Sequence, residues 1–224
     1  MDQTASSGLT KSAWRGTGFG TAMADFDNDG RLDLAVANGR VTRVLGEDKP
    51  QTSTELDAFW IDYSERDQLF LNQGKGKFKD VSLSNDPFCK MAGVSRGLAV
   101  ADFDGDGGVD LLVTRIAEKV AFFQNRAERG NYLIVKATDP ELNRDAYGAE
   151  IYVTSGDRKQ MRWINPGYSF LCSNDPRAHF GLGEQTAYDA IEVVWPNGAK
   201  EQFSGGQANQ MIHLERGTGT PVAE

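Results

Sequence analysis

Two short segments of the chain carry the same arrangement of carboxylates. They read ADFDNDGRLDLAV from Ala24 and ADFDGDGGVDLLV from Ala101, and both follow the order Asp-x-Asp-x-Asp-Gly-x-x-Asp. Carboxylates two positions apart repel one another, and Asp is a poor strand former, so we expect a bound cation to offset the cost. The aspartates concerned are Asp25, Asp27, Asp29 and Asp33 in the first segment and Asp102, Asp104, Asp106 and Asp110 in the second.

The spacing of these aspartates is typical of a calcium loop. Ca²⁺ takes about six to eight oxygen ligands, which Asp side chains and a backbone carbonyl can supply. The sixth position is Gly30 or Gly107, and glycine permits the positive φ that folds carboxylates around one point. The carbonyl of the seventh residue, Arg31 or Gly108, is the expected backbone ligand. The sequence therefore predicts about two Ca²⁺ ions per chain, and Mg²⁺ suits an all-carboxylate cage less well.

The aspartate segments allow two other interpretations. An EF-hand loop begins in the same way but needs an acid at position 12 and a helix after it. Val36 and Val113 occupy position 12, and strand-like apolar runs follow, so each loop is expected to join two β-strands. The metal-free alternative is a pair of Asp/Asn/Gly turns that cap hairpins. The repetition of one carboxylate spacing favours calcium.

Charge and composition restrict the class of partner. The formal net charge is −8, from 32 acidic and 24 basic residues, and the acids without the eight loop aspartates also number 24. The excess acidity therefore belongs to the two loops, and no basic stripe predicts a nucleic-acid partner. No apolar stretch approaches the roughly 18 residues of a membrane span. The first residues, MDQTASSGLTKSAW, lack a signal pattern, so any export signal is expected outside this sequence.

The elements that must position the loops are predicted to be β-strands. The two segments start 77 residues apart, and each repeat is expected to contain about four short strands, with residues 46–66 as an insertion in the first. From Arg129 onward, seven or eight short strand patterns with turns at Gly156 and Gly198 predict a β-sandwich or small barrel without a helix. Those patterns are YLIVKA, AEIYVTS, QMRWI, AHFGL, AIEVVW, EQF and MIHL.

These segments resemble known repeat and domain families. GFGTAMADFDNDGRLDLAV and its second copy resemble the FG-GAP/VCBS repeats of integrin-like β-propellers, whose aspartate loops bind Ca²⁺. The words NRDAYGA, GYSFLCSND, HFGLG and VVWPNG resemble the ASPIC/UnbV domain, which follows such repeats in the cartilage acidic protein family and its bacterial relatives. The resemblance implies two β repeats over residues 1–128, like part of a propeller, and an ASPIC/UnbV-like β domain over residues 129–224.

Two repeats are too few for a closed ring, since propellers have about four to eight blades. We expect either that the chain is the C-terminal piece of a longer protein or that its open blade edges pair with another copy. The resemblance also implies an extracellular, periplasmic or cell-surface location.

Two function classes follow. The first is a non-catalytic, calcium-stabilised adhesion or interaction module with a protein or glycan partner. The second is a carbohydrate-binding or carbohydrate-active protein in which Trp163, Tyr168 and Phe170 form a sugar-stacking platform, although core packing is the favoured role of these aromatics. Motifs for a zinc site, a phosphate loop or a nucleophile elbow are absent from the sequence, and no catalytic residue is predicted.

The remaining candidates for chemistry are two histidines and two cysteines. His179 and His213 fit strand patterns and are predicted to be ordinary packed or surface histidines. Cys89 and Cys172 are too far apart in sequence for a CxxC site, and a bridge between the two regions is a less favoured alternative.

Overall fold

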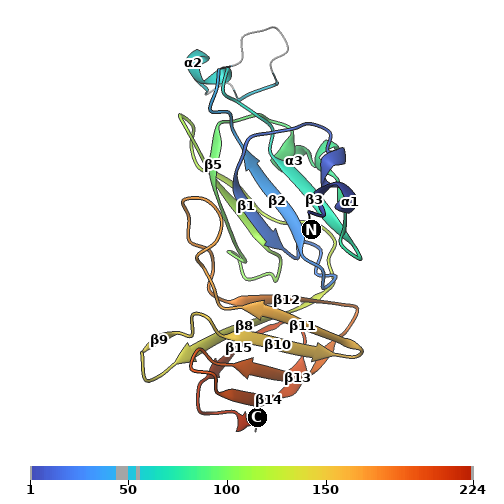
Figure 1. Cartoon of the computed structure of the whole chain (residues 1–224), viewed down its shortest axis with the longest axis vertical. Helices are drawn as coiled ribbons and strands as arrows, with labels where there is room; N and C mark the ends of the chain where they lie inside the picture. Colours follow the sequence, from blue (N-terminus) through green and yellow to red (C-terminus); the bar gives the residue numbers. More distant parts are fainter. Residues whose placement is uncertain (1, 44–49, 54–55, 223–224) are drawn as a thin grey trace.

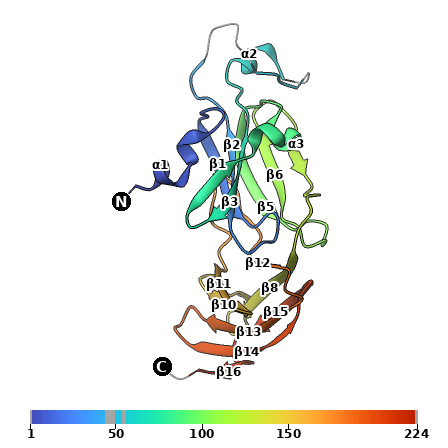
Figure 2. The same ribbon diagram turned by 90° about the vertical axis from the view of Figure 1, so that its right-hand side faces the viewer.

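The computed structural model describes residues 2–43, 50–53 and 56–222, and this part of the chain is built almost entirely of strands and turns (Figure 1). Two groups of sheets are stacked along the long axis of the molecule, as both views show (Figure 2). The group that precedes residue 124 is called the N-terminal sheets, and the group that starts at Asn131 is called the C-terminal sandwich. The predicted all-β class is confirmed.

The N-terminal sheets contain one sheet from each aspartate repeat. The first has four antiparallel strands in chain order, β1 (Gly18–Ala24), β2 (Asp33–Asn38), β3 (Gln68–Gly74) and β4 (Lys77–Asp80). The second has only three, β5 (Ser95–Ala101), β6 (Asp110–Arg115) and β7 (Ala121–Phe123). The fourth strand predicted for the second repeat is missing because the chain leaves β7 for the C-terminal sandwich.

Small side chains let the two N-terminal sheets approach closely. Alternate residues of β1 are buried, among them Ala22, and they pack against Leu98 and Val100 of β5. At Gly20, a Cβ atom would lie 2.5 Å from the Cβ of Leu98, so glycine is required there. The tight packing of β1 on β5 brings the two aspartate loops to the same end of the sheets.

The C-terminal sandwich consists of two sheets around one core. The first has the order β11-β10-β13-β14-β16, and the second has β12-β8-β15, with β9 beside β8. Apolar side chains from both sheets, including Trp195, Phe180 and Leu133, form a single cluster. Of the two predicted alternatives, the sandwich is therefore the one observed. The strands are β8 (Asn131–Asp139), β9 (Arg144–Asp145), β10 (Glu150–Ser155), β11 (Arg158–Trp163), β12 (Ala178–Gly183), β13 (Ala187–Val194), β14 (Lys200–Gln207), β15 (Gln210–Glu215) and β16 (Thr220–Pro221).

The predicted hairpin turns are confirmed. Gly156 lies between β10 and β11 with φ +56°, and Gly198 lies between β13 and β14 with φ +87°. The described helices are single turns and all precede residue 91, so none lies in the C-terminal sandwich. They are α1 (Thr4–Ser7), α2 (Ala58–Ile61), α3 (Asp86–Cys89) and the 3₁₀ turns Leu9–Lys11 and Ser82–Ser84.

The predicted insertion at residues 46–66 lies partly outside the described residues, and its described part contains α2. Within the described ranges, no helix is long and apolar enough to cross a membrane.

A buried carboxylate joins the N-terminal sheets and makes a pH prediction. Asp67 accepts hydrogen bonds from the backbone N–H of Asn38 at 2.8 Å and the hydroxyl of Ser95 at 3.2 Å, and burial raises its pKa to about 6. The folded protein therefore keeps this proton to higher pH than the unfolded chain, whose Asp pKa is about 3.9. The contribution to stability is present below about pH 4 and is lost as the pH rises through 6.

We expect Asp67→Asn to remove that part of the pH dependence. In urea unfolding between about pH 4 and pH 6, the free energy of unfolding should fall less steeply in the variant than in the parent, by on the order of 2 kcal/mol over the range. Other carboxylates titrate equally in both proteins. Equal slopes would contradict the assignment.

Candidate metal centre

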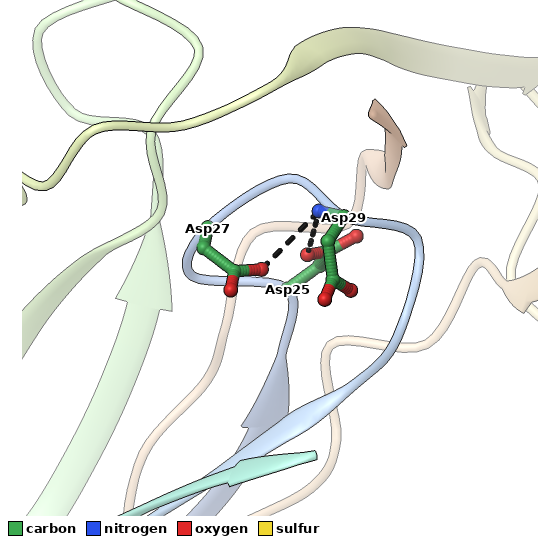
Figure 3. Close-up of side chains that lie close together, drawn as sticks. All are labelled: Asp25, Asp27 and Asp29. Atoms are coloured by element: carbon green, nitrogen blue, oxygen red, sulfur yellow. Dashed lines mark hydrogen bonds between the residues drawn. The ribbon is translucent and has the colours of Figure 1, made fainter. Parts of the chain in front are cut away.

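The first aspartate loop connects β1 to β2 and gathers three carboxylates. One oxygen from each of Asp25, Asp27 and Asp29 lies within 4.8 Å of the other two. The backbone N–H of Asp29 donates to Asp25 Oδ1 at 3.0 Å and to Asp27 Oδ1 at 3.2 Å, so the chain curls around its own amide (Figure 3). Gly30, with φ +88°, donates its N–H to Asp25 Oδ2 at 2.8 Å. The positive φ predicted for this glycine is confirmed.

The second loop connects β5 to β6 and repeats this arrangement. Asp102, Asp104 and Asp106 bring one oxygen each within 4.8 Å of the others. The N–H of Asp106 donates to Asp102 Oδ1 at 3.2 Å and to Asp104 Oδ1 at 3.3 Å, and Gly107 donates to Asp102 Oδ2 at 2.9 Å. The two segments of similar sequence thus adopt one hydrogen-bonding pattern.

The ninth-position aspartates lie beside these trios and not within them. Asp33 accepts from the N–H of Phe26 at 3.1 Å and of Asn72 at 2.8 Å. Asp110 accepts in the same way from Phe103 at 3.0 Å and Asn125 at 2.7 Å. Each carboxylate therefore fastens its loop to neighbouring backbone, which is a structural role in addition to the predicted ligand role.

The seventh-position residues, Arg31 and Gly108, were predicted to offer carbonyl oxygens. In the part of the chain that the structure describes, neither carbonyl accepts a backbone hydrogen bond other than those that pair the strands. The side chain of Arg31 instead forms an ion pair with Asp29, and Arg129 forms the corresponding pair with Asp106 at 2.6 Å. The sequence carried no signal for Arg129, which lies 23 residues after its partner.

Burial makes the ionised carboxylates of the first loop energetically unfavourable. Asp25 is 1 % exposed, and burial raises its pKa to about 7, with further increases from the charges of Asp29 and Asp27. Burial likewise raises the pKa of Asp33 to about 6. A cation among these oxygens would reverse both effects, since a nearby positive charge favours the ionised carboxylate.

The donor set fits a hard divalent cation. Each trio offers oxygen atoms alone, and Ca²⁺ is bound in proteins by carboxylate and carbonyl oxygens. Neither trio contains the sulfur or imidazole donors that zinc prefers. The residues that would hold an ion are Asp25, Asp27 and Asp29 in one loop and Asp102, Asp104 and Asp106 in the other.

The first loop also contacts the C-terminal sandwich and the segment that leads to it. The carbonyls of four consecutive residues, from Phe26 to Asp29, all accept hydrogen bonds from residues beyond the N-terminal sheets. The donors are Asn125 Nδ2 at 2.7 Å, Gly130 N at 2.9 Å, Gly183 N at 2.8 Å and Arg158 Nη1 at 2.6 Å. The conformation of this loop and the seating of the C-terminal sandwich therefore depend on each other.

Asn28 links the two loops directly. It is completely buried, has φ +56°, and its Nδ2 donates to the carbonyl of Gly107 in the second loop at 3.1 Å and to that of Gly130 at 3.2 Å. His179 of the C-terminal sandwich lies with Nε2 3.0 Å from the same Gly107 carbonyl. Asn28 is not among the site residues predicted from the sequence. Its only signal there is that the second loop has Gly105 at the same position.

The central glycine of the HFGLG motif, Gly181, is required by the close contact between β12 and the first aspartate loop. A Cβ atom on Gly181 would lie 2.1 Å from Asp25 Oδ2 and 2.5 Å from the backbone of Asn28. No other residue allows β12 to approach the first loop so closely.

The other candidates have structural places. His213 lies 2.7 Å from the hydroxyl of Thr138 on the surface of the sandwich, and with His179 it fits the prediction of ordinary strand histidines. Cys89 is buried and Cys172 lies with Sγ 3.0 Å from the carbonyl of Leu98, so both are free thiols and the alternative of a bridge is wrong.

The predicted aromatic trio is divided. Trp163 is 59 % exposed, so core packing is wrong for it: it ends the edge strand β11. Tyr168 packs against the core of the N-terminal sheets, whereas Phe170 packs edge-on against Phe19 at 5.0 Å. Trp163 and Tyr168 nevertheless line one pocket, and Phe170 does not belong to its lining.

Two family models match this chain, one within the N-terminal sheets and one within the C-terminal sandwich. Residues 139–221 match the ASPIC and UnbV family, and residues 55–113 match the FG-GAP-like repeat. The two matches lie in separate parts of the chain. The FG-GAP-like match includes the second aspartate loop and ends before the ASPIC and UnbV match begins. The boundary between residues 128 and 129 stays a prediction.

Curated relatives span both parts. The chain is 27 % identical to cartilage acidic protein 1 of Xenopus tropicalis over 88 % of its own length, and 26 % identical to the Homo sapiens protein over 96 %. The Mus musculus protein is 27 % identical over 88 %. These matches cover only 36–38 % of the relatives. The chain therefore spans little more than a third of the length of each of these relatives.

Proposed function

We propose that this chain is a non-catalytic interaction module in which each aspartate loop binds one Ca²⁺ ion. The observation that carries the proposal is the repetition of one oxygen trio, held by the same amide donors, in two segments 77 residues apart. The ions stabilise the hairpins and, through the first loop, the contact with the C-terminal sandwich. They take no part in a reaction.

The proposed location is extracellular, periplasmic or cell-surface. The relatives are named cartilage acidic protein 1, and the FG-GAP/VCBS repeats that the sequence resembles belong to integrin-like β-propellers. Calcium sites of extracellular modules have a Kd of about 10⁻⁴–10⁻³ M, which free calcium outside cells can fill. The proposed partner is a protein or a glycan. The edge strand β7 offers unpaired backbone for self-association if further blades do not cover it, whereas α1 and the 3₁₀ turn Leu9–Lys11 lie against β4.

Single-site variants test the assignment of one ion to each loop. We expect Asp27→Ala to lower the calcium stoichiometry from about two to about one and to destabilise the first repeat, while the second loop still binds. Asp104→Ala is the matched change in the second loop and should give the converse result. Asp157→Ala changes an exposed turn aspartate and should leave the stoichiometry at two. Calorimetric titration provides the measurement, and the same stoichiometry in all four proteins would contradict the assignment.

A further inference from the structure

Three arginines surround a hollow at the end of the N-terminal sheets that points away from the C-terminal sandwich. Arg15 precedes β1, Arg40 follows β2 and Arg66 precedes β3. These strands are antiparallel neighbours in one sheet, so all three arginines lie at the same end of it, near α2 in Figure 1. The first aspartate loop joins β1 to β2 at the opposite end, about 20 Å away along strands of six or seven residues.

The hollow has the size of a small-molecule site and a positive lining. Its volume is about 510 Å³, within the range of about 300–1,000 Å³ for such sites. Among the described residues that line it, Glu65 is the one acid, so three positive charges face one negative charge. The excess positive charge attracts an anion. Besides the arginines and Glu65, the described lining contains Ala13, Trp14, Pro50 and Leu83.

The arginines keep hydrogen-bond donors free. Arg40 Nε pairs with Glu65 Oε1 at 3.0 Å, and Glu65 Oε2 accepts from the N–H of Thr17 at 2.7 Å, so both oxygens of this carboxylate are engaged. Arg66 Nε is enclosed by the protein, but the Nη atoms of Arg40 and Arg66 are not, and they have no hydrogen-bond partner within the described ranges. Arg15 is exposed. A ligand in the hollow can therefore reach the Nη donors.

Trp14 holds Arg66 in place. The guanidinium carbon of Arg66 lies 5.5 Å from the centroid of the Trp14 ring, and the indole N–H donates to the Arg66 carbonyl at 3.0 Å. The ring itself packs against the core of the N-terminal sheets. A guanidinium that is already positioned loses little freedom on binding and presents a planar pair of donors.

A small oxoanion on a polar frame matches these donors. Sulfate and carboxylate groups accept two parallel hydrogen bonds from one guanidinium. The hollow is built at the ends of strands, so an extended acidic peptide finds no strand edge in it to pair with. The net charge of −8 opposes a long polyanion, whose charges would extend beyond the hollow. A single acidic sugar residue meets all of these conditions.

We propose that this hollow binds one acidic sugar residue of a glycan, whose sulfate or carboxylate group accepts hydrogen bonds from the Nη atoms of Arg40 and Arg66, with Arg15 at the rim. The inference rests on the proposed interaction function and makes its glycan partner an acidic one. It uses no aspartate of the two loops, so it can hold or fail independently of the calcium assignment.

Matched small ligands test the proposal on the full chain. Glucose 6-sulfate and methyl β-glucuronide carry the anion on a sugar, methyl β-glucoside is the neutral sugar, and inorganic sulfate and triglutamate carry the anion without one. Calorimetry and saturation-transfer NMR are performed in chelator, below the melting transition, so that calcium cannot bridge the ligand to an aspartate loop. We expect saturable binding of at least one acidic sugar and none of the neutral sugar. Failure of both acidic sugars, or equal or tighter binding of inorganic sulfate or triglutamate, would overturn the proposal.

Arginine variants identify the hollow as the place of binding. Arg66→Ala should raise the Kd about tenfold, and Arg66→Lys, which keeps the charge but loses the planar pair of donors, should raise it less. Arg15→Ala changes an exposed side chain and should also weaken binding. Arg144→Ala removes an exposed arginine of β9, outside this lining, and should leave the Kd unchanged. Melting curves establish that the variants fold. Equal affinity in the parent and in both alanine variants of the hollow would contradict the site.

Discussion

Removing calcium should lower the melting temperature of this chain by roughly 10–20 °C. At a calcium concentration of about 100 times the Kd, each occupied site stabilises the folded state by about 2.7 kcal/mol, so two sites contribute about 5 kcal/mol. For a chain of this size, 1 kcal/mol corresponds to about 2–4 °C. The structural reason is the burial of Asp25 and the crowding of like charges in both loops. The measurement is thermal unfolding in calcium and in chelator.

Two controls separate specific binding from a salt effect. Sodium chloride added to the calcium-free protein at matched ionic strength should restore little of the lost melting temperature, because screening does not replace a ligated ion. The double variant Asp27→Ala/Asp104→Ala should show almost no response to calcium. A full response in the double variant would mean that the ions act elsewhere.

Gly181→Ala should destabilise the fold and weaken calcium binding at the first loop together. The added Cβ would overlap Asp25 Oδ2 and the backbone of Asn28, and overpacking of this kind costs about 1–3 kcal/mol. Because the carboxylate displaced is a proposed calcium ligand, the affinity of the first loop should also fall by about tenfold or more, while that of the second is retained. Urea unfolding and calcium titration measure the two effects.

Gly167→Ala is the matched control. Gly167 is exposed, lies outside the left-handed region, and its new Cβ would meet only the side-chain oxygen of Asn165 at 3.3 Å. Its stability and calcium binding should therefore equal those of the parent. If Gly181→Ala is as stable as this control, the close contact between β12 and the first loop is not required for the fold.

The local features of this protein were predictable from the sequence because they depend on near neighbours. Alternating apolar residues predicted the strands of the sandwich, and Gly156 and Gly198 marked two of its turns. The two aspartate segments predicted their own loops, since Gly30 and the amide of Asp29 organise carboxylates only a few positions away.

The features that sequence analysis missed all depend on residues far apart in the chain. Arg158 reaches the carbonyl of Asp29 across 129 positions, and Asn28 meets Gly107 across 79. The exposure of Trp163 follows from the place of β11 at the edge of its sheet, which strand patterns do not specify. The second repeat lost its expected fourth strand because the connection to β8 takes its place.

The most direct test of the calcium assignment is a calorimetric titration of Ca²⁺ into chelator-stripped protein. We predict about two ions per chain, about one in Asp27→Ala or Asp104→Ala, and none in the double variant. Absence of binding heat in the parent, or two ions in the double variant, would contradict this prediction and leave the aspartate loops as metal-free turns.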